Sequence, residues 1–431
     1  MKRSLLPLLL LFGLLSHVHA ADTTAHRWTM KWNGFVNPHL FADSRQVVAG
    51  REDMMLFYPQ PVVLDNEGAD LNATPSVNLL SITARIGLSV AGPEVLGARP
   101  RAYIEGDWTG PTNATINTLR LRHAFLSLDW TRQQVLLGQY WHPMVVPEIM
   151  PGTCPLNMGA PFHAYARDNQ ARYTLHFDHW QIFGAALFQL DNQSAGPNND
   201  VYLQPSTQQS TAFLKHSLIP ELHLQAQFRT ENLMAGAAAN LLVLMPRTQH
   251  FDAAGQVVKA TDRFASASAT LFLRYTYRQL DIKAQTLLFD NLYEIATLGG
   301  YIEKPMAGTS YLNYDYQPWT FTTLWCDLGR NTGRWRPGLF LGYAWNNDFG
   351  LAFSPEDGIY GRGFNIESLF RIQPRLAFMA GHGLSFYAEV EYTSALYGTA
   401  VNLPNGQQSY QHNEANRANN TRLMLSAVYA F

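Results

Sequence analysis

The chain has 431 residues, of which 47% are hydrophobic and only 15% charged, and its formal net charge is -2. This composition excludes an intrinsically disordered chain, because disorder requires few apolar residues and a high net charge. The near-neutral charge provides no basic footprint for nucleic acid. Two cysteines exclude a disulfide scaffold and a cysteine-rich zinc site.

Residues 1–20 have the pattern of an export signal. Lys2 and Arg3 precede an apolar stretch at 5–15, and Val18-His19-Ala20 provides a cleavage site with small residues at its two outer positions. The apolar stretch is shorter than the about 18 residues of a membrane-spanning helix, which argues against an uncleaved anchor. We therefore expect a signal peptide over 1–20 and one mature domain over 21–431.

The remainder of the chain alternates apolar and polar residues with a period of two, the pattern of β-strands with one apolar face. Near the C-terminus, for example, Leu384, Phe386 and Ala388 alternate with Ser385 and Tyr387. The predicted strands are 27–45, 77–91, 99–108, 118–130, 134–141, 169–178, 179–190, 209–218, 221–233, 263–277, 280–290, 318–328, 335–346, 362–380, 384–397 and 416–431. The apolar stretch 233–245 is predicted to be a loop helix at the rim.

Three features favour a membrane barrel over a soluble sandwich with the same alternation. Short links (178–179, 219–221, 278–279) alternate with long Gly-, Asn- and Pro-rich stretches (142–168, 191–208, 234–262, 291–317, 398–416). Tryptophans lie at segment ends, as expected for girdles at the lipid headgroups; they are Trp28, Trp32, Trp108, Trp130, Trp180, Trp319, Trp325 and Trp345. The chain ends on Phe431, which resembles the signal that the bacterial barrel-assembly machinery reads in its substrates.

The predicted fold is therefore an all-β transmembrane antiparallel barrel of about 16 strands in the lipid of the bacterial outer membrane. Barrels of twelve or eighteen strands remain alternatives, because segment boundaries read from sequence shift by several residues. A barrel of about 22 strands with a plug would leave no residues for the loops.

Three motifs resemble the third-to-fifth-strand region of the DcaP-like trimeric outer-membrane porins. They are Tyr103-Ile104-Glu105-Gly106-Asp107-Trp108, Leu119-Arg120-Leu121-Arg122-His123-Ala124-Phe125 and Leu137-Gly138-Gln139-Tyr140-Trp141. The resemblance implies a homotrimer of sixteen-stranded channels for small, often anionic, nutrients. Two departures are Tyr140, where such porins more often have a small polar residue, and the lack of a heptad segment before the first strand.

Strand parity identifies the charged residues expected to line the pore, since they alternate with the apolar faces. Arginines outnumber acidic residues among them: Arg85, Arg101, Glu105, Asp107, Arg120, Arg122, Arg172, Arg229, Arg274, Arg371, Glu389 and Glu391. Two interpretations follow, a positive excess that prefers anions such as carboxylates, or charges that pair across a polar lumen. Leu119 and Leu121 are out of phase with Leu126, which predicts a bulge near His123-Ala124.

The stretch 142–168 follows the fifth predicted strand, and its Pro and Gly content indicates a compact loop that folds inward to narrow the channel. A simple extracellular loop is the alternative. Cys154 lies in this loop, and Cys326 has the parity of Thr320 and Thr322, which predicts that it faces the lumen. The two cysteines would then either form a disulfide or stay as free thiols.

The sequence contains none of the linear motifs of hydrolases, metalloproteases or nucleotide-binding enzymes, and we expect neither a cofactor nor a metal. The expected function is a porin for passive diffusion of small hydrophilic solutes. The alternatives are a barrel enzyme of phospholipase type, whose Ser-His-Asn site has no linear signature, and a structural or adhesin barrel.

Overall fold

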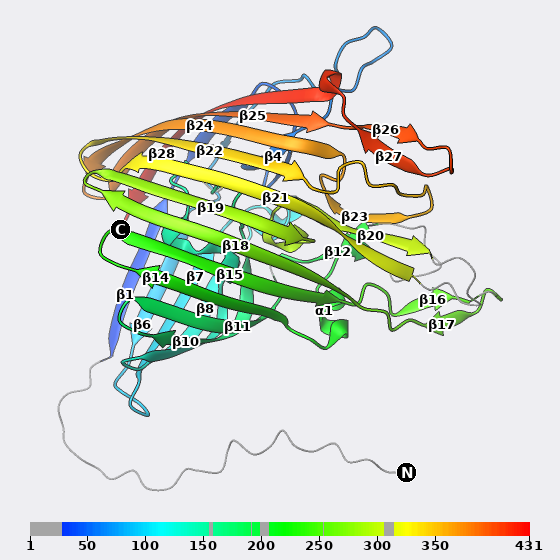
Figure 1. The fold of residues 1–431 in the computed structure, drawn as a ribbon. Helices are drawn as coiled ribbons and strands as arrows, with labels where there is room; N and C mark the ends of the chain where they lie inside the picture. Colours follow the sequence, from blue (N-terminus) through cyan, green and yellow to red (C-terminus); the bar gives the residue numbers. More distant parts are fainter. Residues whose placement is uncertain (1–27, 155–157, 191, 199–206, 253, 306–313) are drawn as a thin grey trace, which may run out of the picture.

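The computed structural model describes residues 28–154, 158–190, 192–198, 207–252, 254–305 and 314–431. The predicted signal peptide, 1–20, lies outside these residues. Within them an antiparallel sheet closes into a barrel (Figure 1), which confirms the predicted fold class. No helix of the described part is long and apolar enough to cross a membrane.

The wall consists of sixteen antiparallel strands, two of which are interrupted by a bend. The interrupted strands are β1 (Thr29–Val36) with β2 (His39–Asp43), and β5 (Ser76–Leu80) with β6 (Arg85–Ala91). The others are β7 (Arg99–Asp107), β8 (Arg120–Asp129), β9 (Gln133–Trp141), β10 (Arg167–His176), β11 (Trp180–Phe188), β14 (Glu221–Arg229), β15 (Leu233–Leu244), β18 (Phe264–Tyr277), β19 (Leu280–Asp290), β21 (Tyr314–Arg330), β22 (Trp335–Asn346), β24 (Ile366–Gly381), β25 (Leu384–Tyr397) and β28 (Arg417–Ala430).

The first strand pairs with the last and so closes the barrel. Phe35 of β1 lies opposite Ala430, and His39 of β2 lies opposite Ser426. The bend between β1 and β2 is at Pro38, which lacks the N–H that a continuous ladder needs. Beyond β28, Phe431 exchanges two backbone hydrogen bonds with Gly34, of 3.0 and 3.1 Å.

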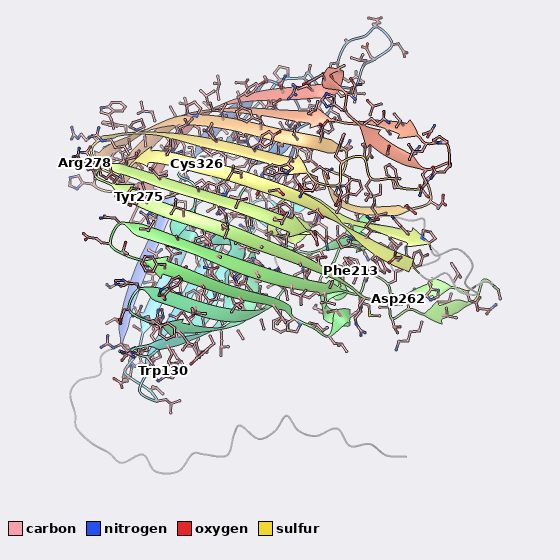
Figure 2. The ribbon with its side chains drawn as sticks, in the orientation of Figure 1. Trp130, Phe213, Asp262, Tyr275, Arg278 and Cys326 are labelled. Atoms are coloured by element: carbon pink, nitrogen blue, oxygen red, sulfur yellow. The ribbon has the colours of Figure 1, made fainter. Side chains whose placement is uncertain are left out.

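The connections differ in length at the two ends of the barrel. The short turns lie at one end of the barrel, where Trp130 and Arg278 are labelled in Figure 2. The first and last described residues of the chain lie at this same end. The other end has the long loops and their local elements (Figure 1). These elements are β3 (Val47–Gly50), β4 (Met55–Pro59), η1 (Asn113–Thr115), η2 (Pro143–Val145), η3 (Pro147–Ile149), β12 (Ala195–Pro197), β13 (Thr207–Gln209), α1 (Ala212–Ser217), β16 (Gln249–Phe251), β17 (Val257–Lys259), η4 (Tyr293–Ile295), β20 (Gly299–Pro305), β23 (Gly358–Arg362), β26 (Thr399–Asn402), β27 (Gln408–Gln411) and η5 (Glu414–Asn416).

The outer wall is apolar, as a surface against lipid must be. Leu224, Leu271 and Leu423, for example, are exposed on it. The tryptophans predicted to form girdles divide into two groups. Trp28, Trp32, Trp108, Trp180 and Trp345 are exposed, and Trp130 is half-buried. Trp319 and Trp325 are buried inside the barrel instead, so their assignment to a girdle was wrong.

Two segments have a different secondary structure from the one predicted. Residues 212–217 form helix α1 rather than a strand, and its Phe213 and Leu214 pack against Leu242 and Leu244 of β15. The stretch 233–245, predicted as a helix, is strand β15. Apart from Asn240, its inward side chains are apolar, and Leu242 and Leu244 among them face α1. The strand therefore shows almost no polar alternation with a period of two. The link 219–221 consequently lies at the long-loop end, and the short turn is 230–232.

Candidate solute pathway inside the barrel

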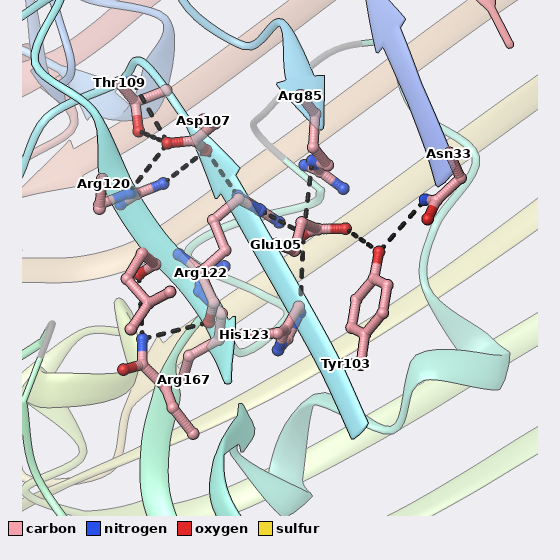
Figure 3. A network of polar contacts seen from close by, with 12 residues as sticks. Asn33, Arg85, Tyr103, Glu105, Asp107, Thr109, Arg120, Arg122, His123 and Arg167 are labelled. Carbon is pink, nitrogen blue, oxygen red and sulfur yellow. Dashed lines mark hydrogen bonds and ion pairs between the residues drawn. The ribbon is translucent and has the colours of Figure 1, made fainter. Parts of the chain in front are cut away.

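A ladder of ion pairs lies on the inner wall formed by β7 and β8 (Figure 3). The guanidinium of Arg120 donates to the carboxylate of Asp107 over 2.9 and 3.2 Å. Arg122 bridges both acids, with Nε 2.6 Å from Glu105 and a terminal nitrogen 2.8 Å from Asp107. Arg85 of β6 lies 3.5 Å from Glu105. Each carboxylate is therefore held by two arginines.

A β-bulge in β8 turns two consecutive side chains of this ladder inward. The pairing with β7 shifts register after Glu105, and both Arg122 and His123 are buried. The side-chain amide of Gln139 donates to two backbone carbonyls beside the bulge, at 3.1 Å each, in place of the interrupted ladder bonds. The bulge predicted near His123-Ala124 is confirmed.

The loop 142–166, called here the inward loop, ends against the ladder. The hydroxyl of Tyr165 accepts hydrogen bonds from Arg122 at 3.4 Å and from Arg167 at 3.3 Å. The Arg167 guanidinium also lies over the ring of Trp141, 4.8 Å from its centre. Burial alone would raise the pKa of Tyr165, but Arg167, Arg122 and Arg120 outweigh it and lower this pKa to about 6. The surrounding arginines thus favour the ionised form of this tyrosine.

The inward loop crosses the barrel and is fixed to the opposite wall. Its backbone carbonyls accept hydrogen bonds from wall side chains, and two of its amides donate to wall carboxylates. The contacts are Gln285 to Met144 (3.0 Å), Lys283 to Met150 (2.8 Å), Thr323 to Phe162 (3.0 Å), Arg371 to Ala160 (2.6 Å), Gly152 to Asp327 (2.8 Å) and Cys154 to Glu389 (2.8 Å). The predicted inward fold of this loop is confirmed.

The hairpin β3–β4 also enters the barrel and packs beside the inward loop. Arg371 donates to the backbone carbonyls of Leu56 and Phe57, at 3.2 and 3.0 Å, and Tyr397 donates to that of Pro59 at 2.7 Å. Apolar side chains of both segments and of the wall form one core inside the barrel. It includes Met54, Met144, Val145, Ile149, Phe162, Leu287, Trp319, Phe321, Trp325 and Phe340.

This core fills much of the lumen at the level of the inward loop. Inward-facing side chains around the wall are buried there, among them His39, Arg122, Gln285, Arg371 and Arg422. The inward segments therefore narrow the lumen between an outer compartment on the long-loop side and an inner compartment on the short-turn side.

A cavity lies in each compartment, and the two share no lining residue. The inner one, of about 520 Å³, opens toward the short turns and is bordered by Lys31, Arg101 and Arg172 together with Asp129 and Glu148. The outer one, of about 290 Å³, is bordered by segments of six loops at the long-loop end. Its charged lining residues are Arg51, Glu294 and Arg362.

The twelve charged residues predicted to line the pore occupy different environments. Arg101 and Arg172 border the inner cavity, and Arg85 borders a third cavity of about 250 Å³ beside Cys154. Glu105, Asp107, Arg120 and Arg122 form the ladder. The remaining five have partners inside the barrel: Arg229 with Glu148 (2.8 Å), Arg274 with Asp281 (3.0 Å), Arg371 with Glu391 (3.1 Å) and Glu389 with Gln373 (2.7 Å).

Sequence reasoning missed several residues of these compartments. Tyr165 and Glu148 belong to the inward loop, and Arg362 belongs to another long loop, where no periodicity indicates a direction. Arg167 lies beside Asp168 at the start of β10, and both are buried, so parity does not apply at that strand end. Only the arginine content of the segment 167–172 could have drawn attention to it.

Both cysteines are free thiols, so the disulfide alternative is wrong. Cys154 is buried in the inward loop, and burial raises its pKa. Cys326 alternates with Trp325, whose ring faces His163 of the inward loop at 5.2 Å. It therefore lies on the outer wall (Figure 2). The parity argument failed because the aromatic side of β21 faces the core inside the barrel and not lipid.

Histidine contacts give no support to the phospholipase alternative. In the described part of the chain, the histidine rings bond to groups such as Thr83, Glu221 and the carbonyl of Val145, and none to a serine. Within the same residues there is no group of three or more His, Cys, Asp or Glu side chains placed to hold a metal ion.

No protein-family model and no curated protein matches the chain. Solved structures do match it. The outer membrane channel DcaP of Acinetobacter baumannii is similar over 96% of this chain and 100% of that chain, with a TM-score of 0.60 and 14% identity. An anion-selective porin from Comamonas acidovorans covers 94% and 100%, with a TM-score of 0.55 and 9% identity.

A third similar structure is the trimer form of OmpT, an outer membrane protein of Vibrio cholerae. It covers 94% of this chain and 99% of that chain, with a TM-score of 0.51 and 9% identity. The motifs at 103–108, 119–125 and 137–141 had indicated the first of these three relatives. The chain has the fold of these outer-membrane proteins, and the predicted resemblance to the DcaP channel is confirmed at the level of the fold.

Proposed function

We propose that this chain is a porin of the bacterial outer membrane that passes small hydrophilic solutes and prefers anions such as carboxylates. The closed sixteen-stranded wall with an apolar outside supports a membrane location, and the export pattern of residues 1–20 supports passage to the outer membrane. The fold shared with the trimer form of OmpT supports a homotrimer.

The anion preference rests on the charges of the inner cavity. Lys31, Arg101 and Arg172 border it, against Asp129 and Glu148. Asp129 pairs with Arg101 at 3.1 Å, and Glu148 pairs with Arg229 at 2.8 Å. Within the described residues, Lys31 and Arg172 have no carboxylate partner. A narrow cavity with low-dielectric walls focuses such a field and attracts small anions.

Arg172 is held in place for this role. Its guanidinium lies 4.5 Å from the ring centre of Phe183 and 5.5 Å from that of Tyr140. It donates to the neutral oxygens of Gln170 and Trp141, at 3.0 and 3.3 Å. The guanidinium is therefore held at a fixed position and forms no ion pair with a carboxylate among the described residues. The Comamonas acidovorans porin, described as anion-selective, shows that such a preference is compatible with this fold.

The inward segments narrow the lumen, and movement of one of them would widen it. The hairpin β3–β4 is the smaller of the two inward segments, and its chain continues into the wall at β2 and β5. We therefore include a closed resting state in the proposal, with this hairpin as the segment that moves.

The test is the reversal potential of single channels in a planar bilayer under a salt gradient. We expect the wild-type protein to conduct in brief openings and to prefer chloride over potassium. A double variant, Lys31→Gln with Arg172→Gln, should shift the potential toward potassium. The control is Arg278→Gln, in an exposed turn at the end of the barrel (Figure 2). An absence of conductance, a cation-selective wild type or an unchanged potential would each contradict the proposal.

A further inference from the structure

Arg362 is a fixed arginine at the outer cavity. It ends β23, a short strand beyond the barrel wall at the long-loop end (Figure 1). Its guanidinium lies 4.1 Å from the ring centre of Phe57 and 4.4 Å from that of Tyr293. These rings belong to two different loops. The planar guanidinium is thus held between two aromatic faces. A ligand can therefore reach it only at its edge.

The backbone that presents Arg362 depends on two glycines. In the pairing of β20 with β23, Gly300 lies opposite Gly361. A Cβ atom on Gly300 would lie 2.0 Å from the carbonyl oxygen of Tyr360, and one on Gly361 would lie 2.2 Å from that of Gly299. No larger residue fits at this approach. The strand is therefore built closely against β20, which sets the position of Arg362.

Part of the hydrogen-bonding capacity of the Arg362 guanidinium is unused. One terminal nitrogen donates to the carbonyl oxygen of Thr297 at 2.9 Å. Among the described residues, its Nε and its second terminal nitrogen donate to no acceptor, and no carboxylate forms an ion pair with it. The side chain is half-buried and borders the outer cavity. A half-buried cation of this kind is stabilised when an anion completes its hydrogen bonds.

Glu294 borders the same cavity but does not cancel this charge. Its side chain is buried, and neither of its carboxyl oxygens has a hydrogen-bond partner among the described residues. Burial and the neighbouring Glu221 raise the pKa of Glu294, which favours the neutral, protonated form. A neutral Glu294 leaves the positive charge of Arg362 uncompensated by this carboxyl group.

We propose that the outer cavity is a capture site for small carboxylates and that Arg362 grips the carboxylate through its free edge. The proposal rests on the proposed porin function and gives it an entrance site. A carboxylate is planar and can meet the edge of a guanidinium through two parallel hydrogen bonds, in the plane left between the rings of Phe57 and Tyr293. The cavity volume of about 290 Å³ limits the ligand to a small molecule.

The test is calorimetric titration of acetate into the full-length protein in detergent. Arg362→Gln should weaken binding by about ten-fold or more, because a charge-assisted bidentate contact is lost. Arg362→Lys keeps the positive charge but loses the two parallel N–H groups of the guanidinium, and it should bind acetate with intermediate strength. Arg278→Gln, at the other end of the barrel, is the matched control and should bind like the wild type.

Three results would overturn the proposal: no acetate binding to the wild type, unchanged binding to Arg362→Gln, or inorganic phosphate bound as tightly as acetate. If Arg362→Gln fails to fold, Tyr293→Leu removes one face of the clamp without changing the charge, and its acetate affinity should also fall. Calorimetry reports the site independently of conductance. A protein that binds acetate but never conducts would refute the porin function and leave the capture site intact.

Discussion

Tyr165 is the residue through which the inward loop meets the basic wall. Its hydroxyl contacts Arg122 and Arg167, and its backbone amide donates to the carbonyl of Ile295 at 2.7 Å. One residue thus connects the ladder, the inward loop and the loop after β19. A phenolate in this position would strengthen both arginine contacts, since charge-assisted hydrogen bonds are about twice as strong as neutral ones.

We predict that Tyr165 ionises as the pH rises through about 6. Because its folded-state pKa lies below that of a free tyrosine, the phenolate stabilises the fold at alkaline pH, and this contribution is lost as the pH falls through about 6. The difference in ultraviolet absorbance between wild type and Tyr165→Phe should show a tyrosinate band above that pH. A difference spectrum without this band until about pH 10 would contradict the prediction.

Single residues were predictable from sequence where strand parity applies. Glu105 and Asp107 lie on β7, and Arg120 and Arg122 lie on β8 up to its bulge; all four alternate with apolar residues and are buried inside the barrel. Tyr165 and Arg362 lie in long loops, where direction depends on contacts between segments far apart in the chain. Such contacts have no local signature, so the sequence predicted that the inward loop exists but not which of its residues reach the wall.

At the level of strands and loops, Arg371 of β24 joins both inward segments to the wall. It is fully buried and bonds to Ala160 of the inward loop, to Leu56 and Phe57 of β4, and to Glu391 of β25. The arginine therefore stabilises the closed arrangement of two segments that enter the barrel independently.

We predict that Arg371→Met destabilises the protein by about 3–5 kcal/mol, because it leaves Glu391 buried without its cation. It should also loosen the β3–β4 hairpin, so that limited proteolysis cuts the segment 47–59 faster than in wild type. The control is Arg417→Gln, whose partner Glu414 is exposed and whose loss should cost about 0–1 kcal/mol. Equal unfolding midpoints and equal cleavage for the two variants would disprove this role of Arg371.

The strands that sequence misassigned share one cause. Trp319, Phe321 and Trp325 of β21 are apolar on the inner face, and the inner face of β15 is apolar except for Asn240. An outer-membrane strand is normally read as apolar toward lipid and polar toward water. Where loops pack a hydrophobic core inside the barrel, this rule inverts, and nothing within the strand itself reveals the inversion.

For the whole molecule, the two ends of the barrel predict its orientation in the membrane. Long loops of outer-membrane barrels face outward, and short turns face the periplasm. A tag inserted after Asn405, in the exposed β26–β27 loop, should be labelled on intact cells. A tag after Glu231, in the turn 230–232, should be labelled only after the outer membrane is permeabilised. The reverse pattern would show that the orientation is wrong.

The junction between the first and last strands also constrains how this protein is made. The hydrogen bond between Asn37 and Ser426 joins residues 389 positions apart, and the bonds between Gly34 and Phe431 involve the final residue of the chain. Contacts of such long range form slowly in folding. Until β28 pairs with β1, β2 and β25, these strands keep an unpaired edge, and an unpaired edge can pair with a strand of another chain. A folding intermediate without this junction is therefore prone to aggregate.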